Sequence, residues 1–135
     1  MRLTMKLTLS AKEKNQLLVT ALQYFGESLR VWEHQVDYEN TDYINAKIKM
    51  IKNTESLICV EDIYAYMILK GKGIKIVDCE DEENIVLFDF RKFNQNISKC
   101  DYSDIMKLLD DNGDYDFYNT DAVLQCLIFG EVTYG

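Results

Sequence analysis

Proline is absent from this 135-residue chain, although average usage would give roughly seven. Asparagine, isoleucine and lysine are abundant, with nine Asn and twelve Ile. Proline codons are rich in G and C, whereas the codons of Asn, Ile and Lys are rich in A and T. The composition is therefore consistent with an AT-rich bacterial or phage genome, and it says nothing about chemistry.

Glycine is also sparse, with six residues, and no Ser/Gly-rich or low-complexity stretch divides the chain. Flexible linkers and internal repeats are therefore not expected. With 47% hydrophobic and 28% charged residues, the composition is that of an ordinary globular protein, and the length suffices for one hydrophobic core. We predict a single domain over residues 1–135.

No apolar run reaches the roughly 20 residues that a transmembrane helix needs. The N-terminus alternates apolar and polar residues from Met1 to Leu9, which is typical of a strand and not of a secretory signal peptide. We therefore expect a cytoplasmic protein that makes no membrane contact.

Histidine and close cysteine pairs, the usual ligands of zinc, are nearly missing. The four cysteines are separated by 20, 21 and 26 residues, and His34 is the single histidine. Zinc sites bring their ligands in closely spaced pairs, so this spacing predicts reduced and mostly buried thiols instead of a metal site. We expect His34 to be a surface or capping group. The sequence predicts no catalytic residue, no metal ligand and no cofactor.

Basic residues are scarce in the second half of the chain, and this imbalance is its most informative property. From Ile76 to Gly135 there are fourteen acids and four bases, whereas the first thirty residues carry five bases and two acids. A net charge of -8 disfavours binding to nucleic-acid phosphates, which requires a basic face. An acidic half behind a basic N-terminal third instead indicates a basic partner or a cation.

The N-terminal third contains the clearest helix of the sequence. Ser10 and Glu13 form a capping-box pattern, in which the side chain of each residue satisfies a backbone N–H of the other. The apolar residues that follow at helical spacing are Leu18, Leu22, Phe25, Leu29, Trp32 and Val36. This stripe predicts one core-facing helix of about five turns.

The rest of the chain alternates shorter helices with a hairpin. Ile44, Ile48 and Ile51 mark a shorter helix that ends near Asn53 and runs antiparallel to the first. The further elements expected are a helix carrying Leu57 to Ile68 and ended by Gly71, or a strand beginning at Leu57–Val60; a hairpin of Ile74–Cys79 and Ile85–Phe90; helices starting near Asp101 or Ser103 and near Thr120 or Asp121; and a last strand over Glu131–Tyr134. The prediction is an α+β fold, with a long N-terminal helix and several shorter helices packed on a small, mainly antiparallel sheet.

Five acids cluster in the turn of the predicted hairpin: Asp78, Glu80, Asp81, Glu82 and Glu83. One interpretation is a solvated turn kept open by the mutual repulsion of its charges. The other is a projecting anionic loop that enters a basic cleft of a protein partner, where each charge adds mainly to association rate and salt sensitivity.

A second acidic cluster is interleaved with tyrosines. Aromatic side chains supply rigid contact area and acids supply electrostatic steering, so the cluster predicts a protein interface. The alternative is that some of these tyrosines pack in the hydrophobic core and have no role in binding. The candidate partner-binding residues are Asp110, Asp111, Asp114, Tyr115, Asp116 and Tyr118.

The same segment has part of the pattern of a calcium-binding loop. Oxygen ligands alternate from Asp110 to Asp116, and Asp121 occupies the twelfth place. Tyr115 stands where such a loop needs Gly, and Asp replaces the bidentate Glu, so both departures disfavour binding. A divalent-metal protein or metal-dependent enzyme that uses Asp110, Asp114 and Asp116 is an alternative to the interface.

The leading hypothesis is a small acidic protein-interaction module that presents carboxylates and tyrosines to a basic surface of a protein partner. In its sharpest form it is an inhibitor from a phage or mobile element that mimics nucleic acid and occupies a basic groove of a host enzyme such as a CRISPR effector. The analogy with small acidic inhibitors, including anti-CRISPR proteins, rests on composition alone. The alternative is an assembly or immunity subunit that binds through an apolar helix face. In either case we expect no direct nucleic-acid binding, and a monomer or homodimer.

Overall fold

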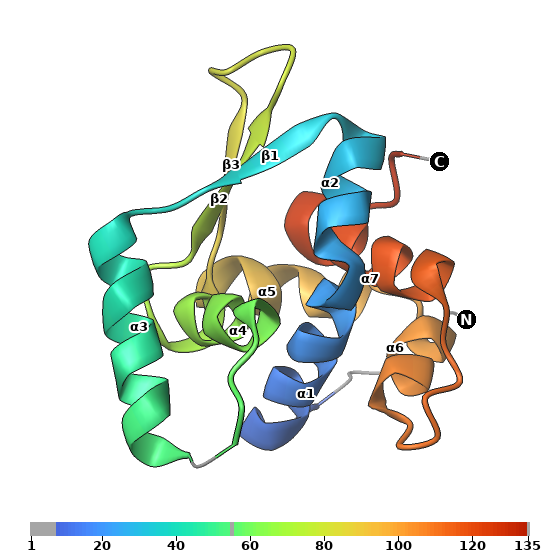
Figure 1. The fold of residues 1–135 in the computed structure, drawn as a ribbon. Coiled ribbons are helices and arrows are strands. Elements are labelled where there is room, and N and C mark those ends of the chain that lie inside the picture. Colours follow the sequence, from blue (N-terminus) through green and yellow to red (C-terminus); the bar gives the residue numbers. More distant parts are fainter. Residues whose placement is uncertain (1–7, 55, 135) are drawn as a thin grey trace.

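Residues 8–54 and 56–134 are described by the computed structural model, and they form a body of helices with one small sheet toward one end (Figure 1). The predicted α+β architecture is confirmed, including the long N-terminal helix and the antiparallel sheet. The elements in chain order are α1 (Ala11–Ala21), η1 (Leu22–Tyr24), α2 (Phe25–Trp32), β1 (His34–Asp37), α3 (Asn40–Asn53), α4 (Val60–Lys70), β2 (Ile74–Asp78), β3 (Ile85–Phe88), α5 (Phe90–Asn96), η2 (Ile97–Lys99), α6 (Tyr102–Leu109) and α7 (Phe117–Phe129).

The first helix begins where the capping box predicts. The Ser10 Oγ accepts a hydrogen bond of 3.1 Å from the Glu13 N–H, and the Ser10 N–H donates one of 3.0 Å to the Glu13 carboxylate. One 3₁₀ turn, η1, then joins α1 to α2 without a break in the helical path. The predicted N-terminal strand falls mainly on residues 1–7, which lie outside the described residues.

The end of the first helix is earlier than predicted. Glu33 adopts a left-handed conformation with φ of 57°, and this residue ends α2 directly after Trp32. Val36, which continued the apolar spacing in the sequence, lies in β1 and pairs with Ile76 of β2. A strand that follows a helix can present an inward residue at helical spacing by coincidence, and the spacing alone does not separate the two cases.

The sheet contains three antiparallel strands in the order β1-β2-β3. The predicted hairpin of β2 and β3 is confirmed, with Ile74 opposite Phe88 and Val77 opposite Ile85. The added strand β1 pairs along the other edge of β2, from His34 opposite Asp78 onward. The strand predicted over Glu131–Tyr134 is wrong, since the described part of this segment has no strand structure.

The helix α3 ends at Asn53 as predicted, but the isoleucines that mark it do not face the core. Ile44, Ile48 and Ile51 are 52%, 45% and 55% exposed, whereas Ala46 is buried and Met50 is half-buried. The helix therefore carries two apolar faces, and the face with Ala46 and Met50 lies against the rest of the protein. The next helix, α4, starts at Val60 and contacts both α1 and α3, so the alternative of a strand at Leu57–Val60 is wrong.

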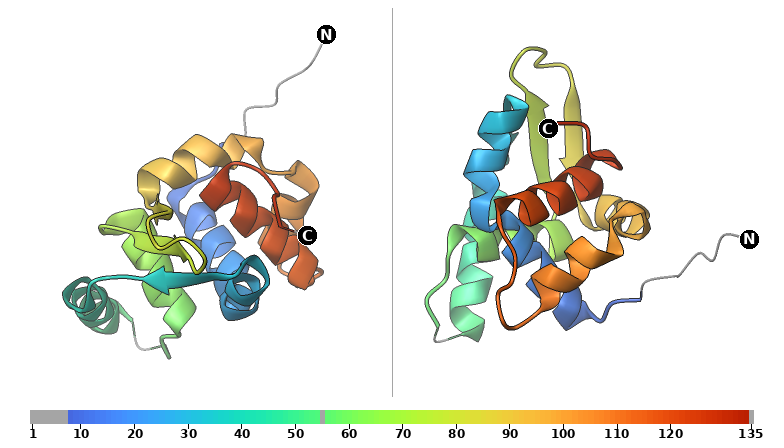
Figure 2. Two further views of the ribbon diagram at one scale, coloured as in Figure 1. Left: turned by 90° about the horizontal axis from the view of Figure 1, so that it is seen from above. Right: turned by 90° about the vertical axis from the view of Figure 1, so that its right-hand side faces the viewer.

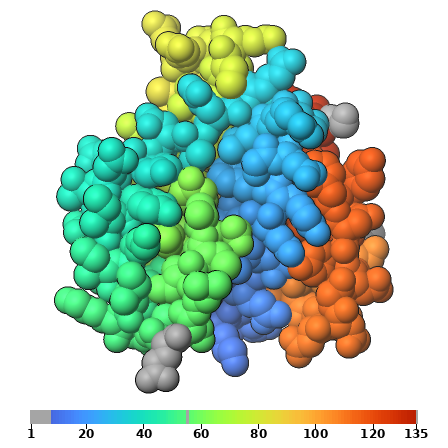
Figure 3. Space-filling view, in the orientation of Figure 1, coloured from blue at the N-terminus to red at the C-terminus, as the bar shows by residue number. Residues whose placement is uncertain are grey.

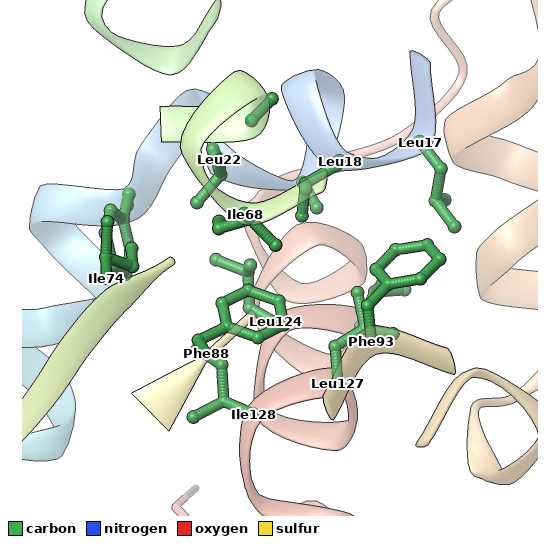
Figure 4. Close-up of a cluster of buried hydrophobic side chains, with 14 of the residues drawn as sticks. Leu17, Leu18, Leu22, Ile68, Ile74, Phe88, Phe93, Leu124, Leu127 and Ile128 are labelled. Carbon is green, nitrogen blue, oxygen red and sulfur yellow. The ribbon is translucent and has the colours of Figure 1, made fainter. Parts of the chain in front are cut away.

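The core is centred on α7, which contacts α1, α5 and α6. Its residues from Thr120 to Ile128 are buried, apart from the half-buried Ala122. Figure 4 shows how α1, η1, α4, α5, α7 and the two hairpin strands contribute to one apolar cluster, which includes Leu17, Leu18, Leu22, Ile68, Ile74, Phe88, Phe93, Leu124, Leu127 and Ile128. Within the described residues, no helix combines the length and apolar character needed to cross a bilayer.

Candidate protein-interaction site

The tip of the turn between β2 and β3 projects from the molecule. It projects beyond the ends of the neighbouring elements in Figure 1 and in the right-hand view of Figure 2, and rises above the body in the space-filling view (Figure 3). The structure places the five predicted acids together in this turn. Asp78 is half-buried at the end of β2, whereas Glu80, Asp81, Glu82 and Glu83 are exposed.

Two of these acids shape the turn that carries the others. The Asp78 carboxylate accepts a hydrogen bond of 2.9 Å from the Glu80 N–H, and the Asp81 carboxylate accepts one of 3.2 Å from the Glu83 N–H. Backbone bonds from the Asp81 N–H to the Asp78 carbonyl and from the Asn84 N–H to the Asp81 carbonyl close the same turn. Because the short side chains of these aspartates fix the backbone in this way, the turn has a defined shape without a partner.

Glu33 joins this cluster from the end of α2, and the sequence analysis missed it. Its carbonyl accepts a hydrogen bond of 2.9 Å from the Cys79 N–H, which ties the helix end to the turn. Its carboxylate lies beside that of Glu80, and the hydrogen bond and negative charge of Glu33 raise the pKa of Glu80. Glu33 was expected inside a continuous helix, so no pattern in the sequence pointed to this contact. The six residues Glu33, Asp78, Glu80, Asp81, Glu82 and Glu83 are called the acidic hairpin below.

A buried aromatic layer lies beneath the acidic hairpin. His34 is only 7% exposed, which corrects the expectation of a surface or capping group. Its Nδ1 lies 2.6 Å from the Trp32 carbonyl, and the centroid of its ring is 5.5 Å from that of Phe129 and 5.4 Å from that of Tyr134. The pKa of Asp78 is lowered mainly by the hydrogen bond from the Glu80 N–H, with a smaller contribution from His34. The pKa of Tyr134 is raised by burial and by the charge of Asp78.

A network of buried polar groups holds this layer in place. The Trp32 Nε1 donates to the Asp121 carboxylate at 3.0 Å, and the Gln125 side-chain amide donates to its other oxygen at 2.7 Å. The Gln125 carbonyl oxygen accepts the N–H groups of Thr133 and Tyr134 at 2.8 and 2.7 Å. Each buried polar group in this chain of bonds therefore has a partner, and the C-terminal segment is fixed against α7.

The second acidic cluster lies at the opposite end of the molecule, in the loop between α6 and α7 (Figures 1 and 2). Asp110, Asp111, Asp114 and Asp116 are exposed there. The structure therefore does not join the two predicted acidic clusters into one face.

Several residues of this loop serve the fold of the chain itself. The Asp110 carboxylate accepts the Asn112 N–H at 3.1 Å, and Asp116 caps α7 by accepting the Asn119 N–H at 3.0 Å. The helix thus begins at Phe117, three or four residues before the predicted start near Thr120 or Asp121. The Tyr115 hydroxyl donates to the Gln23 side chain, and Tyr118 is 77% exposed. Of the two tyrosines predicted to lie in an interface, Tyr118 has most of its surface exposed, whereas Tyr115 is half-buried.

The calcium-loop pattern is not assembled in three dimensions. Asp121, its twelfth residue, is buried in α7, and its oxygens accept from Trp32 and Gln125. Across residues 8–54 and 56–134, no three His, Cys, Asp or Glu side chains are grouped so that they could hold a metal ion.

Two of the four cysteines depart from the expectation of burial, since Cys59 and Cys79 are exposed. The neighbouring Cys126 thiol and burial together raise the pKa of Cys100.

A second exposed surface is apolar and lies on α3. Ile44, Ile48 and Ile51 form a row along the helix at spacings of four and three residues, and we call it the α3 stripe. Lysines 47, 49 and 52 lie on the same helix and are exposed. The acidic hairpin and the α3 stripe thus differ completely in the chemistry that they offer a partner.

Comparison with known proteins finds no family model, no curated protein and no solved structure that matches this chain. The geometry and charge of the surfaces described above are therefore the grounds on which a function can be proposed.

Proposed function

We propose that this protein is a small interaction module that docks its acidic hairpin on a basic surface of a protein partner. One observation carries the proposal: six carboxylates from the end of α2 and the β2–β3 turn are gathered on a projecting and internally hydrogen-bonded hairpin. A surface that is already ordered loses little conformational entropy when it binds.

Repulsion within the acidic hairpin favours a cationic partner. Glu33 and Glu80 lie close enough to raise the pKa of Glu80, so the deprotonated pair is unfavourable in the free protein. Lysine and arginine side chains brought between these carboxylates remove that repulsion and add attraction. Exposed charges of this kind contribute mainly to the association rate and make binding sensitive to salt.

A nucleic-acid-binding protein is the form of partner that this chemistry fits best. Its binding groove is lined by Lys and Arg, and an anionic hairpin can compete with phosphates for part of that groove. The proposal therefore includes an inhibitor carried by a phage or mobile element and acting in the cytoplasm on a host enzyme such as a CRISPR effector. Because the second acidic cluster lies at the other end of the molecule, the acidic hairpin alone would make this contact.

A pull-down with two charge-matched variants tests the proposal. One variant neutralises the turn (E80Q, D81N, E82Q and E83Q), and the control neutralises the α6–α7 loop (D110N, D111N, D114N and D116N), so both remove four charges. Asparagine keeps the hydrogen-bond acceptors at Asp81, Asp110 and Asp116. The tagged proteins are incubated with bacterial lysate at low and at moderate salt, and captured proteins are identified by mass spectrometry.

The proposal predicts a basic partner that is captured at low salt by the wild type and the loop variant but not by the turn variant. Added DNA should displace a partner that uses its nucleic-acid groove. Equal capture by the turn variant and the wild type would exclude the acidic hairpin as the docking element.

The α3 stripe favours a second candidate, an assembly or immunity subunit that binds through an apolar helix face. Three isoleucines at 45–55% exposure on one helix are a continuous apolar row of the kind that interfaces bury. Capture by this surface should survive moderate salt and should be lost in the variant I44S, I48S and I51S. Loss of capture in the turn variant, with no change in the stripe variant, would exclude this candidate.

A further inference from the structure

A hollow of about 640 Å³ opens between the first turn of α1, the ends of α3 and α4, and the start of α5. Its walls are mostly apolar and its rim is basic. We call it the lysine groove and define it by Met50, Leu69, Phe90, Lys12, Lys14 and Lys70. None of these residues belongs to the acidic hairpin or to the α3 stripe.

Aromatic rings hold two of the ammonium groups at the groove. The Lys14 Nζ lies 5.2 Å from the centroid of the Phe90 ring and donates a hydrogen bond of 3.1 Å to the Asn94 side chain. The Lys70 Nζ lies 5.7 Å from the centroid of the Tyr66 ring, which also lines the hollow. These contacts place positive charge directly above apolar surface.

The groove is locally positive, whereas the protein as a whole is negative. Three lysines and no acid line it among the described residues, in a chain with a net charge of -8. An anion that enters the groove therefore meets local attraction, whereas a cation meets three like charges. Its volume lies within the range of roughly 300–1,000 Å³ that small-molecule pockets have.

We propose that the lysine groove binds a small anionic amphiphile, namely a medium-chain monocarboxylate. The apolar chain lies on Met50, Leu69 and Phe90, and the carboxylate lies within reach of Lys14 and Lys70. The concave shape fits a single molecule, because a flat bilayer surface could not follow the walls of the hollow. The site is independent of the proposed docking of the acidic hairpin.

A titration followed by NMR of the methionine methyl groups tests this site on the whole protein. The probe is decanoate, added below its micelle concentration, and the neutral control ligand is decan-1-ol. The signal of Met50 is assigned with the variant M50L. We expect a saturable shift of the Met50 signal with decanoate and a clearly weaker effect of decan-1-ol.

Two pairs of substitutions separate local charge from net charge. Because each exposed charge pair contributes modestly, K14Q with K70Q should weaken decanoate binding by about tenfold. The matched pair K75Q with K107Q removes two exposed lysines outside the groove and should leave the affinity unchanged. The variant A11W, at an exposed position on the groove wall, should block binding without entering the core.

Three results would overturn the proposal. These are the absence of a saturable shift of Met50, equal affinities for decanoate and decan-1-ol, and an equal loss of affinity in the two lysine pairs. Unchanged binding in A11W would place the bound molecule elsewhere on the protein.

Discussion

The acidic hairpin and the α6–α7 loop have similar compositions and both use carboxylates to order their turns, but the hairpin also brings like charges from two elements together. In the loop, Asp116 caps α7, Asp110 orders its own turn and Tyr115 bonds to Gln23 of η1. In the hairpin, Glu33 arrives from a distant part of the chain and lies against Glu80, so like charges are brought together. The comparison teaches that the density of acids along a sequence does not tell whether the carboxylates stabilise the fold or are presented to another molecule.

The strongest test of this comparison contrasts a buried acid with an exposed one. Asp121→Ala leaves the buried Trp32 N–H and one N–H of the Gln125 amide without an acceptor, so we expect a loss of about 2–4 kcal/mol in the free energy of unfolding. Asp111→Ala, in the exposed loop, should change it by less than about 0.5 kcal/mol. Urea denaturation measures both. Equal losses would show that burial does not distinguish these acids.

The helix cap in the loop should give the next largest effect. Asp116→Ala removes the acceptor of the Asn119 N–H at the start of α7, at an expected loss of about 1 kcal/mol in stability. Asp116→Asn keeps an acceptor at this position and should be nearly neutral. Urea denaturation of the two variants checks the prediction, which fails if Ala and Asn have the same effect.

Neutralising the hairpin should act in the opposite direction. The variant E80Q, E82Q and E83Q removes mutual repulsion without removing a backbone cap, so we expect a small rise in melting temperature. The rise should be larger at low salt, because salt screens exposed charges. Thermal unfolding at two ionic strengths measures it. A fall in melting temperature at low salt would mean that these glutamates stabilise the free fold.

The smallest effect concerns the titration of Glu80. Its pKa is raised in the folded state, so its protonated form favours folding; this contribution is present at acidic pH and is lost as the pH rises through the folded pKa. Glu33→Gln removes the main charged neighbour and should return the pKa of Glu80 toward its ordinary value. NMR titration of the carboxyl carbon of Glu80 measures the change in its pKa. The pKa of Asp78 serves as the control and should stay low, because the Glu80 N–H is the main cause of its lowering.

Local patterns predicted local structure well. The cap at Ser10, the cap at Asp101 (one of the two predicted there) and the β2–β3 hairpin each depend on residues close together in the chain, and all three are present. The acidic turn could also be predicted, because five of its acids lie within one short segment. These features required no knowledge of how distant elements pack.

The errors lie where distant contacts decide between two local alternatives. The helix α3 has the stripe of Ile44, Ile48 and Ile51 and a second face with Ala46 and Met50, and only the position of α4 determines which face is covered. Val36 fitted a helix by spacing but pairs in the sheet. Glu33 and His34 could not be placed, because their surroundings come from β2, α7 and the C-terminal segment.

The way in which Gln125 holds the C-terminal segment has a consequence for sequence variation. In the C-terminal segment, its side chain bonds to main-chain atoms of Thr133 and Tyr134, so these bonds do not depend on which side chain stands at position 133. Position 133 can therefore accept different side chains while the path of the segment is retained. Gln125 itself cannot be replaced in the same way. A Glu at this position would keep the acceptor but lose the donor to the Tyr134 carbonyl, and it would place a second carboxylate beside that of Asp121.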